Sequence, residues 1–168
     1  WRKRAKRWLR DRRLRGSERP VDDSMRRRTR LVMTLLVRDE EELLEWNLEH
    51  HFAQGVDFVV VTDHGSVDRT PAILESYRRR GRLHVIREES DSYEQSKWVN
   101  RMGRLAVEAF GADLVFHCDA DELWHAPGDG LKDELLSLPD VDVLKVPSVN
   151  VLLRERGGVE RFPEDAVY

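Results

Sequence analysis

The chain has 168 residues, 40% of them hydrophobic and 36% charged, with a formal net charge of −3 at pH 7. This composition suits one soluble α/β domain and argues against membrane-spanning helices, because the longest apolar runs, such as residues 58–61, are too short to cross a bilayer. A single cysteine, Cys118, cannot form an internal disulfide, and no segment has the pattern of a signal peptide, so we expect a cytoplasmic protein. Because the chain begins with Trp1 and ends abruptly at Tyr168, we expect it to be part of a longer protein.

Charge is distributed unevenly along the sequence. Residues 1–30 contain fourteen Lys or Arg and four Asp or Glu, whereas the remainder contains fifteen basic and twenty-eight acidic residues. We therefore expect a basic N-terminal arm or linker at residues 1–30 and one acidic domain at residues 31–168. The arm could be a solvated extension, or it could attach the protein to a partner or to anionic lipid at the inner face of the membrane. Nucleic-acid binding has no other support in the chain, and we do not expect it.

The first half of the domain predicts a strand, a helix and a second strand. Residues 31–37 form a near-continuous apolar run, which is typical of a strand buried on both faces. Asp39 is expected to cap the following helix, with Glu42 completing a capping box and Gly55 ending the helix. Residues 58–62 then predict the second strand.

The same alternation continues through the second half. A helix is expected to begin at Thr70, as the N-cap, with a proline in its first turn, and to end near Gly81. An apolar stripe at residues 98, 102, 105 and 109 predicts a further helix, closed by Gly111. The remaining expected elements are a strand at residues 83–86, a strand at residues 114–118, a short helix at residues 131–136 and a strand at residues 143–151.

Strands that alternate with helices predict an α/β fold with a mainly parallel sheet. In such sheets ligands bind outside the carboxyl ends of the strands, so the segments that follow the strands are the candidates for chemistry. Those segments are residues 38–40, 63–66, 87–89 and 119–122. Three of the four are strongly acidic, and such crowding of like charges is unfavourable unless a cation lies among them.

Asp119 and Asp121 form a DxD pattern directly after an apolar strand. Two carboxylates one residue apart in an extended turn can point toward one hard cation, Mn²⁺ or Mg²⁺, which could bridge the phosphates of a nucleotide diphosphate. The pattern alone is weak, and a second copy, Asp140 and Asp142, precedes a predicted strand and therefore lies at the wrong end of the sheet. Position selects Asp119 and Asp121, for which ordinary turn residues are the alternative.

Other polar residues near the strand ends have simpler interpretations. Asp63 ends the second strand, where its carboxylate could accept hydrogen bonds from a nucleobase or a ribose. Asp68 is expected to have a structural role at the next helix, and His64 is interpreted as a turn residue. The adjacent His50 and His51 face different directions on a helix and cannot chelate one metal together. No Cys/His spacing suggests zinc, and no GxxxxGK[ST] phosphate loop is present. The first strand is not followed by a GxGxxG motif, which argues against a dinucleotide-binding oxidoreductase.

Four segments resemble, in order, motifs of the family-2-like glycosyltransferases, and in particular a branch with a DADE metal turn. They are VRDE at residues 37–40, EWNLEHHFAQGVD at residues 45–57, TDHGSVDRT at residues 62–70 and CDADEL at residues 118–123. The resemblance spans about residues 31–124. It implies a GT-A fold, which is a Rossmann-like three-layer α/β/α arrangement, and metal-dependent transfer of a sugar from a nucleotide-diphosphate sugar to a glycan, lipid or protein acceptor.

The resemblance also implies site residues. Val37, Arg38 and Glu40 would line the nucleoside pocket, and Asp63 would contact the base or ribose. Asp119 and Asp121 would bind the ribose, the diphosphate and the Mn²⁺ or Mg²⁺ ion. Gln95 and Asn100 would face the donor. The chain departs from the family at Asp39, where Asn is usual, and at His64, where Asn or Asp is usual.

The catalytic base is not assigned. Inverting members of the family place it well downstream of the DxD, but only forty-seven residues follow Asp121 here, so we expect the domain to be C-terminally incomplete. Glu155, Glu160 and Glu164 lie in this region, and no motif distinguishes one of them as the base.

Two other functions stay open. A nucleotidyltransferase would also combine a Rossmann-like sheet with acidic metal ligands, but it would carry a glycine-rich basic loop after the first strand. Residues 38–41 are instead acidic and lack glycine. A non-catalytic nucleotide-binding module, with the basic arm as its working part, is disfavoured by the intact DxD at the expected strand end.

Overall fold

The computed structural model describes residues 20–90, 93–126, 130–138, 152–153 and 166–167. The chain divides into two compact units, one of residues 19–138 and one of residues 1–18 with 139–168. In the second unit, the described strands β5 (Leu152–Leu153) and β6 (Ala166–Val167) pair antiparallel. The predicted strand at 143–151, the second DxD, the three downstream glutamates and the first nineteen residues of the arm lie outside the described residues. No helix among the described residues is long and apolar enough to cross a membrane.

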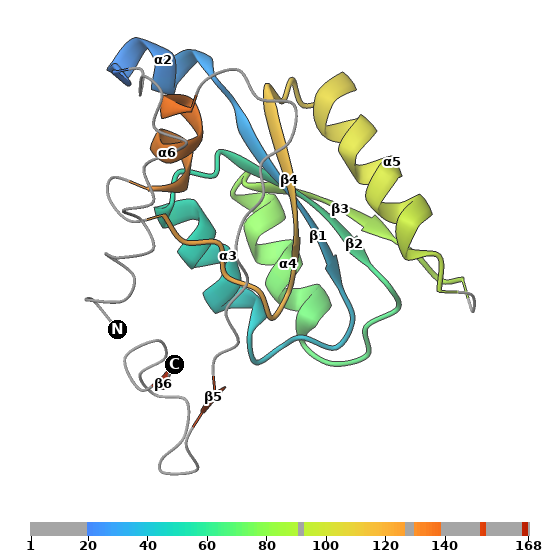
Figure 1. The fold of residues 1–168 in the computed structure, drawn as a ribbon. Coiled ribbons are helices and arrows are strands. Elements are labelled where there is room, and N and C mark those ends of the chain that lie inside the picture. The colour runs from blue at the N-terminus through green and yellow to red at the C-terminus, as the bar shows by residue number, and fades with distance from the viewer. Residues whose placement is uncertain (1–19, 91–92, 127–129, 139–151, 154–165, 168) are drawn as a thin grey trace. The chain divides into compact units, whose positions relative to one another are not determined.

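The larger unit is built on a sheet of four parallel strands in the order β3–β2–β1–β4 (Figure 1). The strands are β1 (Leu31–Val37), β2 (Phe58–Asp63), β3 (Leu83–Arg87) and β4 (Leu114–Asp119). The helices are α2 (Asp23–Arg28), α3 (Leu44–Ala53), α4 (Thr70–Arg79), α5 (Gln95–Glu108) and α6 (Leu131–Ser137). Every residue of the two central strands is buried, as the continuous apolar runs predict. The predicted α/β class and parallel sheet are confirmed.

Helices cover both faces of this sheet and give three layers (Figure 1). Successive strand residues point to opposite faces, so Met33 joins the core formed with α3 and α4, whereas Val32 joins the core formed with α5. Leu48 of α3 packs in the first core, and Trp98 and Met102 of α5 pack in the second. Each face of the sheet therefore has its own hydrophobic core.

The start of α3 differs from the prediction. The helix begins at Leu44 with Leu43 at the N-cap position, and no side chain caps it. Asp39 instead has a φ of 54°, and its Oδ1 accepts a hydrogen bond from the backbone N–H of Val67 at 2.8 Å. The predicted capping box is wrong, because the Asp39 carboxylate bonds to the neighbouring loop rather than to the helix that follows it.

The short helix α6 packs closely against the end of α3. The backbone N–H of Lys132 donates to the carbonyl of Gln54 at 3.1 Å, and its side chain forms an ion pair with Asp57 at 2.8 Å. Gly55 and Gly130 both have positive φ, and a Cβ on Gly55 would stand only 2.7 Å from the Cβ of Lys132. Glycine is required at residue 55 for both its backbone conformation and this close approach.

Helix α2 lies within the predicted basic arm and was not predicted. None of its residues is buried, and Asp22 caps it by accepting a hydrogen bond from the N–H of Met25. Arg26 reaches α6, where its Nε and Nη2 donate to the two carboxylate oxygens of Asp133 at 2.6 and 3.1 Å. The end of the arm is therefore attached to the domain by a charged pair.

Candidate functional site

The parallel register brings three of the predicted site residues to adjacent strand ends. Val37, the last residue of β1, pairs with Asp63, the last residue of β2. Asp119, the last residue of β4, pairs with Leu36 on the other side of β1. Asp63 in turn pairs with Arg87 at the end of β3. The carboxyl edge of the sheet therefore carries the line Arg87, Asp63, Val37 and Asp119.

Asp63 and Asp119 face opposite sides of the sheet at this edge. Asp63 lines a cavity together with residues of α4. Cys118 packs in the core with α3, so strand alternation directs Asp119 and His117 to the α5 side, where His117 Nε2 lies 3.4 Å from Asp119 Oδ1. A ligand that contacts both carboxylates must therefore cross the edge of the sheet.

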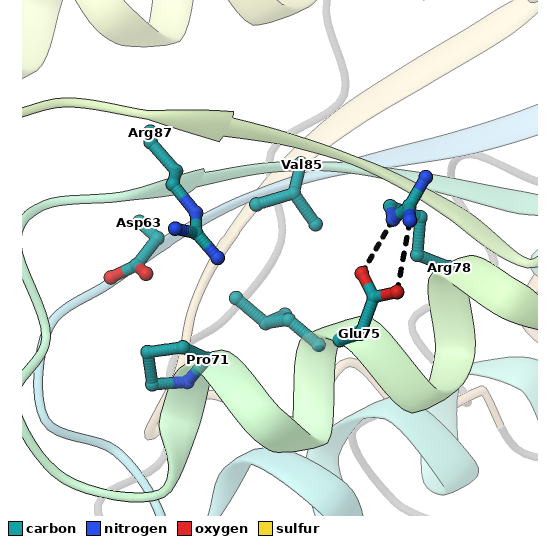
Figure 2. A pocket seen from close by; sticks show the side chains of 7 residues that line it. Asp63, Pro71, Glu75, Arg78, Val85 and Arg87 are labelled. Atoms are coloured by element: carbon teal, nitrogen blue, oxygen red, sulfur yellow. Dashed lines mark hydrogen bonds and ion pairs between the residues drawn. The ribbon is translucent and has the colours of Figure 1, made fainter.

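The cavity beside Asp63 has a volume of about 340 Å³ (Figure 2). It is lined by Asp63, Pro71, Leu74, Glu75, Arg78, Val85 and Arg87. Figure 2 shows Asp63 and Arg87 near one end and the ion-paired Glu75 and Arg78 near the other. Asp63 is only 4% exposed, and its Oδ1 accepts a hydrogen bond from the N–H of Ser66 at 3.1 Å. The sequence marked residues 87–89 as a strand-end segment but gave Arg87 no role, and the available signal was a basic residue directly after a predicted strand.

The loops that follow β1 and β2 are joined by hydrogen bonds between side chains and backbone. Three backbone N–H groups of the first loop donate to side chains beyond β2: Asp39 to Ser66 Oγ at 3.0 Å, Glu40 to Thr70 Oγ1 at 2.8 Å and Glu41 to Asp68 Oδ2 at 2.9 Å. Two bonds run in the other direction. Asp39 Oδ1 accepts from the N–H of Val67, and Glu41 Oε2 accepts from the N–H of Arg69, each at 2.8 Å. Asp68 Oδ1 also accepts from the N–H of Thr70 at 2.8 Å, which confirms the structural role of Asp68. Arg69, and not Thr70 as predicted, occupies the N-cap position of α4. Residues 39–41 and 66–70, which form the rim of the site, are therefore held in place by hydrogen bonds to each other.

Acidic side chains gather where the β1 loop meets the turn after β4. The Glu40 pKa is raised by its burial and by the negative charges of Asp121, Asp68 and Asp39. Asp121 is exposed, and the Asp119 side chain is 47% exposed. The described residues contain no group of three or more His, Cys, Asp or Glu side chains placed to hold a metal ion together. Two accessible carboxylates nonetheless fit Mg²⁺ or Mn²⁺, since such ions are commonly held by one or two carboxylates together with substrate phosphates and water.

The remaining predicted donor residues are less closely grouped. Arg38 is exposed after β1, and Gln95 is the first residue of α5. Asn100 lines a second cavity, of about 620 Å³, that also includes Thr34 and His117. This cavity involves α5 and β4 and does not include Asp63, so the structure does not bring Asn100 together with Asp63. His117, whose Nδ1 lies 3.1 Å from Thr34 Oγ1, is a polar neighbour of Asp119 that sequence reasoning left without a role.

The predicted turn residue His64 is buried beside the end of β2. Its Nε2 lies 2.9 Å from the carbonyl of Ser90, and its ring packs against Trp98 with 4.6 Å between ring centroids. His64 therefore links the loop after β3 to α5, and Asp63 is the residue at this strand end that lines the cavity.

No protein-family model matches the chain, and the search of curated proteins found no match. Among solved structures, S. aureus TarS 1-349 in complex with UDP matches with 24% sequence identity and a TM-score of 0.48, covering 56% of this chain and 28% of that one. S. aureus TarS 1-349 in complex with UDP-GlcNAc matches with 24% identity and a TM-score of 0.46, covering 56% and 27%. The chain thus corresponds to less than a third of the length of these structures.

Proposed function

We propose that this chain is the nucleotide-sugar-binding part of a metal-dependent glycosyltransferase with a GT-A fold. The observation that supports this most directly is the alignment of Asp63 and Asp119 at neighbouring carboxyl ends of one parallel sheet. The family motifs that the sequence resembles follow in the same chain order. The negative charges of Glu40 and Asp121 repel each other, and a bound cation near them would relieve this repulsion.

Side chains at the carboxyl edge of the sheet would bind different parts of the donor. Asp63 and Arg87 would contact the nucleoside from the cavity beside α4, and Val37 and Glu40 would line its approach. Asp119 and Asp121 would hold Mn²⁺ or Mg²⁺, which when bound supplies positive charge that stabilises the diphosphate leaving group. An acceptor hydroxyl would then attack the anomeric carbon with inversion, and we assign no catalytic base.

The hydrogen bonding of the β1 loop disfavours nucleotidyl transfer. A phosphate-binding loop needs backbone N–H groups that are free to donate to phosphate oxygens. The N–H groups of residues 39, 40 and 41 instead donate to side chains within residues 66–70. Residues 39–41 are therefore engaged as the rim of a pocket and are not available as a phosphate cradle.

Metal-linked stabilisation tests this proposal. Thermal unfolding of the 168-residue chain would be followed with UDP, GDP, CDP or ADP, each with and without Mn²⁺. At a ligand concentration about 100-fold above Kd, the binding nucleotide should stabilise the fold by about 3 kcal/mol, mainly when Mn²⁺ is present. Asp121→Asn should remove the effect of Mn²⁺, whereas the matched change Asp23→Asn on α2 should not. Equal stabilisation with and without Mn²⁺ would contradict the proposal.

A further inference from the structure

The backbone of the turn after β4 lies on polar side chains of α3. Asn47 is 1% exposed, and its Nδ2 donates to the carbonyls of Ala120 at 3.0 Å and Glu122 at 2.8 Å. The carbonyl of Asp119 lies within 3.4 Å of the same nitrogen. One buried amide therefore faces three of the four carbonyls between residues 119 and 122.

Two adjacent histidines of α3 hydrogen-bond to both backbone polar groups of Trp124. His51 Nδ1 lies 2.8 Å from the carbonyl of Asn47, so this nitrogen carries the proton, and Nε2 accepts the N–H of Trp124 at 3.1 Å. His50 Nε2 donates to the carbonyl of the same Trp124 at 2.9 Å. His51 Nδ1 also lies 3.1 Å from Asn47 Oδ1, which orients the amide so that its Nδ2 faces the turn. Asn47 and His51 thus form one connected hydrogen-bond network.

This network is costly unless every member is satisfied, because buried polar groups lose their bonds to water. Asn47 and His51 occupy the same buried side of α3 as Leu44 and Leu48, at a spacing where apolar residues would serve for packing alone. The turn they support buries Ala120 and exposes Asp121. The backbone of the turn is thus bonded inward to α3, while its carboxylates remain accessible.

We propose that Asn47 and His51 are positioning residues, which hold the backbone of residues 119–124 so that the Asp119 and Asp121 carboxylates converge on one cation. This inference rests on the proposed function for the cation, but the restraint on the turn can be measured separately. Residues that orient metal ligands typically change metal affinity by about 10–100-fold when they are replaced.

The test compares Asn47→Leu and His51→Leu with Leu83→Ala in the 168-residue chain. Leu83 is 3% exposed and is the first residue of β3, at the end of the sheet opposite the carboxyl edge, so its truncation controls for a general loss of stability. Mn²⁺ affinity would be measured by electron paramagnetic resonance of free Mn²⁺, with MnCl₂ alone and with UDP. Amide hydrogen exchange at Glu122 and Trp124 would report the turn itself.

Both α3 variants should weaken Mn²⁺ binding by about 10–100-fold and speed amide exchange at residues 122 and 124, while Leu83→Ala changes neither. Unchanged Mn²⁺ affinity or unchanged exchange in the α3 variants would overturn the inference, as would equal losses in Leu83→Ala. If the unsubstituted chain binds no Mn²⁺, the proposed function fails, and the exchange rates alone decide whether α3 holds the turn.

A measurement on the unsubstituted chain covers the case in which a variant fails to fold. Long-range ¹H–¹⁵N correlation of the histidine rings should show His51 as the neutral tautomer with its proton on Nδ1. A proton on Nε2 would overturn the inference, because that nitrogen could not then accept the N–H of Trp124.

Discussion

Asp63 and Arg87 occupy paired positions at the ends of β2 and β3, and both line the cavity shown in Figure 2. One provides a carboxylate and the other a guanidinium, so together they offer an acceptor and several donors to a ligand that enters beside α4. Arg78 lines the same cavity, but its guanidinium is already paired with Glu75 at 2.6 Å. The two arginines of one cavity therefore differ in their availability to a ligand.

Replacement of Asp63 or Arg87 should weaken nucleotide binding more than replacement of Arg78. Asp63→Asn keeps an oxygen for the N–H of Ser66 but removes the charge, and Arg87→Gln removes the guanidinium. Because hydrogen bonds to charged groups contribute about 1.5–3 kcal/mol, each change should raise Kd by about tenfold or more. Isothermal titration with the nucleoside diphosphate that stabilises the chain would measure this. An equal loss in Arg78→Gln would indicate a general effect on the cavity instead.

The burial of His51 should make the stability of the fold depend on pH. Burial, which outweighs its hydrogen bond to Asn47, lowers the pKa of His51 to about 4 from an ordinary value of 6.5. The unfolded chain therefore takes up a proton below pH 6.5 that the folded chain refuses, and the stabilisation present above pH 6.5 is lost as the pH falls toward 4. Between pH 7.5 and pH 5 the contribution of His51 to the free energy of unfolding should fall by about 2 kcal/mol.

Urea unfolding at several pH values, carried out in parallel on His51→Gln, would isolate this contribution from those of the carboxylates. The difference in the free energy of unfolding between the two proteins should become smaller as the pH falls, because the variant has no imidazole to protonate at residue 51. Parallel pH profiles for the two proteins would show that His51 titrates normally in the folded state.

The two glycines at residues 55 and 81 should respond differently to alanine. Both have positive φ, at 95° and 69°, but a Cβ at Gly81 would meet no atom within 4 Å, whereas one at Gly55 would stand 2.7 Å from the Cβ of Lys132. Gly81→Ala should therefore cost only the backbone strain, about 1–2 kcal/mol. Gly55→Ala should cost about 1–3 kcal/mol more, because α6 must move. Equilibrium unfolding in urea would measure both, and equal costs would contradict the close packing of α6 on α3.

Cys118 should be inert to alkylation in the folded protein. Its side chain is fully buried, and burial raises the pKa of the thiol to about 12. Iodoacetamide at pH 7.5 should therefore modify it only after unfolding, which mass spectrometry in the presence and absence of urea would show. Rapid modification of the native chain would mean that the turn after β4 opens easily.

The two central strands were predictable because each is a nearly continuous apolar run between polar segments. Residues 31–37 and 58–63 are buried on both faces, so the pattern needed no knowledge of partners. The capping box at Asp39 had the right residue types, but the carboxylate has a competing donor, the N–H of Val67, which lies twenty-eight residues away in the sequence. Local sequence cannot reveal which of two such donors lies closer in the folded chain.

The supports of the turn after β4 were missed for a related reason. Asn47 and His51 are polar residues inside a helix, where such residues most often face water. The signal was their spacing, since they share an i, i+3, i+4, i+7 pattern with Leu44 and Leu48 and so belong to the buried side. Asp63 and Asp119 could be selected because a parallel sheet fixes the edge at which strands end. Which face each one takes became visible only with the register of the neighbouring strands.

The central position of β1 has a consequence for synthesis on the ribosome. Its partner β4 follows far along the chain, with Thr34 and His117 separated by 83 residues. At about 5–20 residues per second, β1 waits roughly 4–16 s for that partner to be made, with one hydrogen-bonding edge open. An open apolar edge is a template for wrong pairing. The nascent chain should therefore engage a chaperone that binds extended apolar segments until Asp119 has emerged.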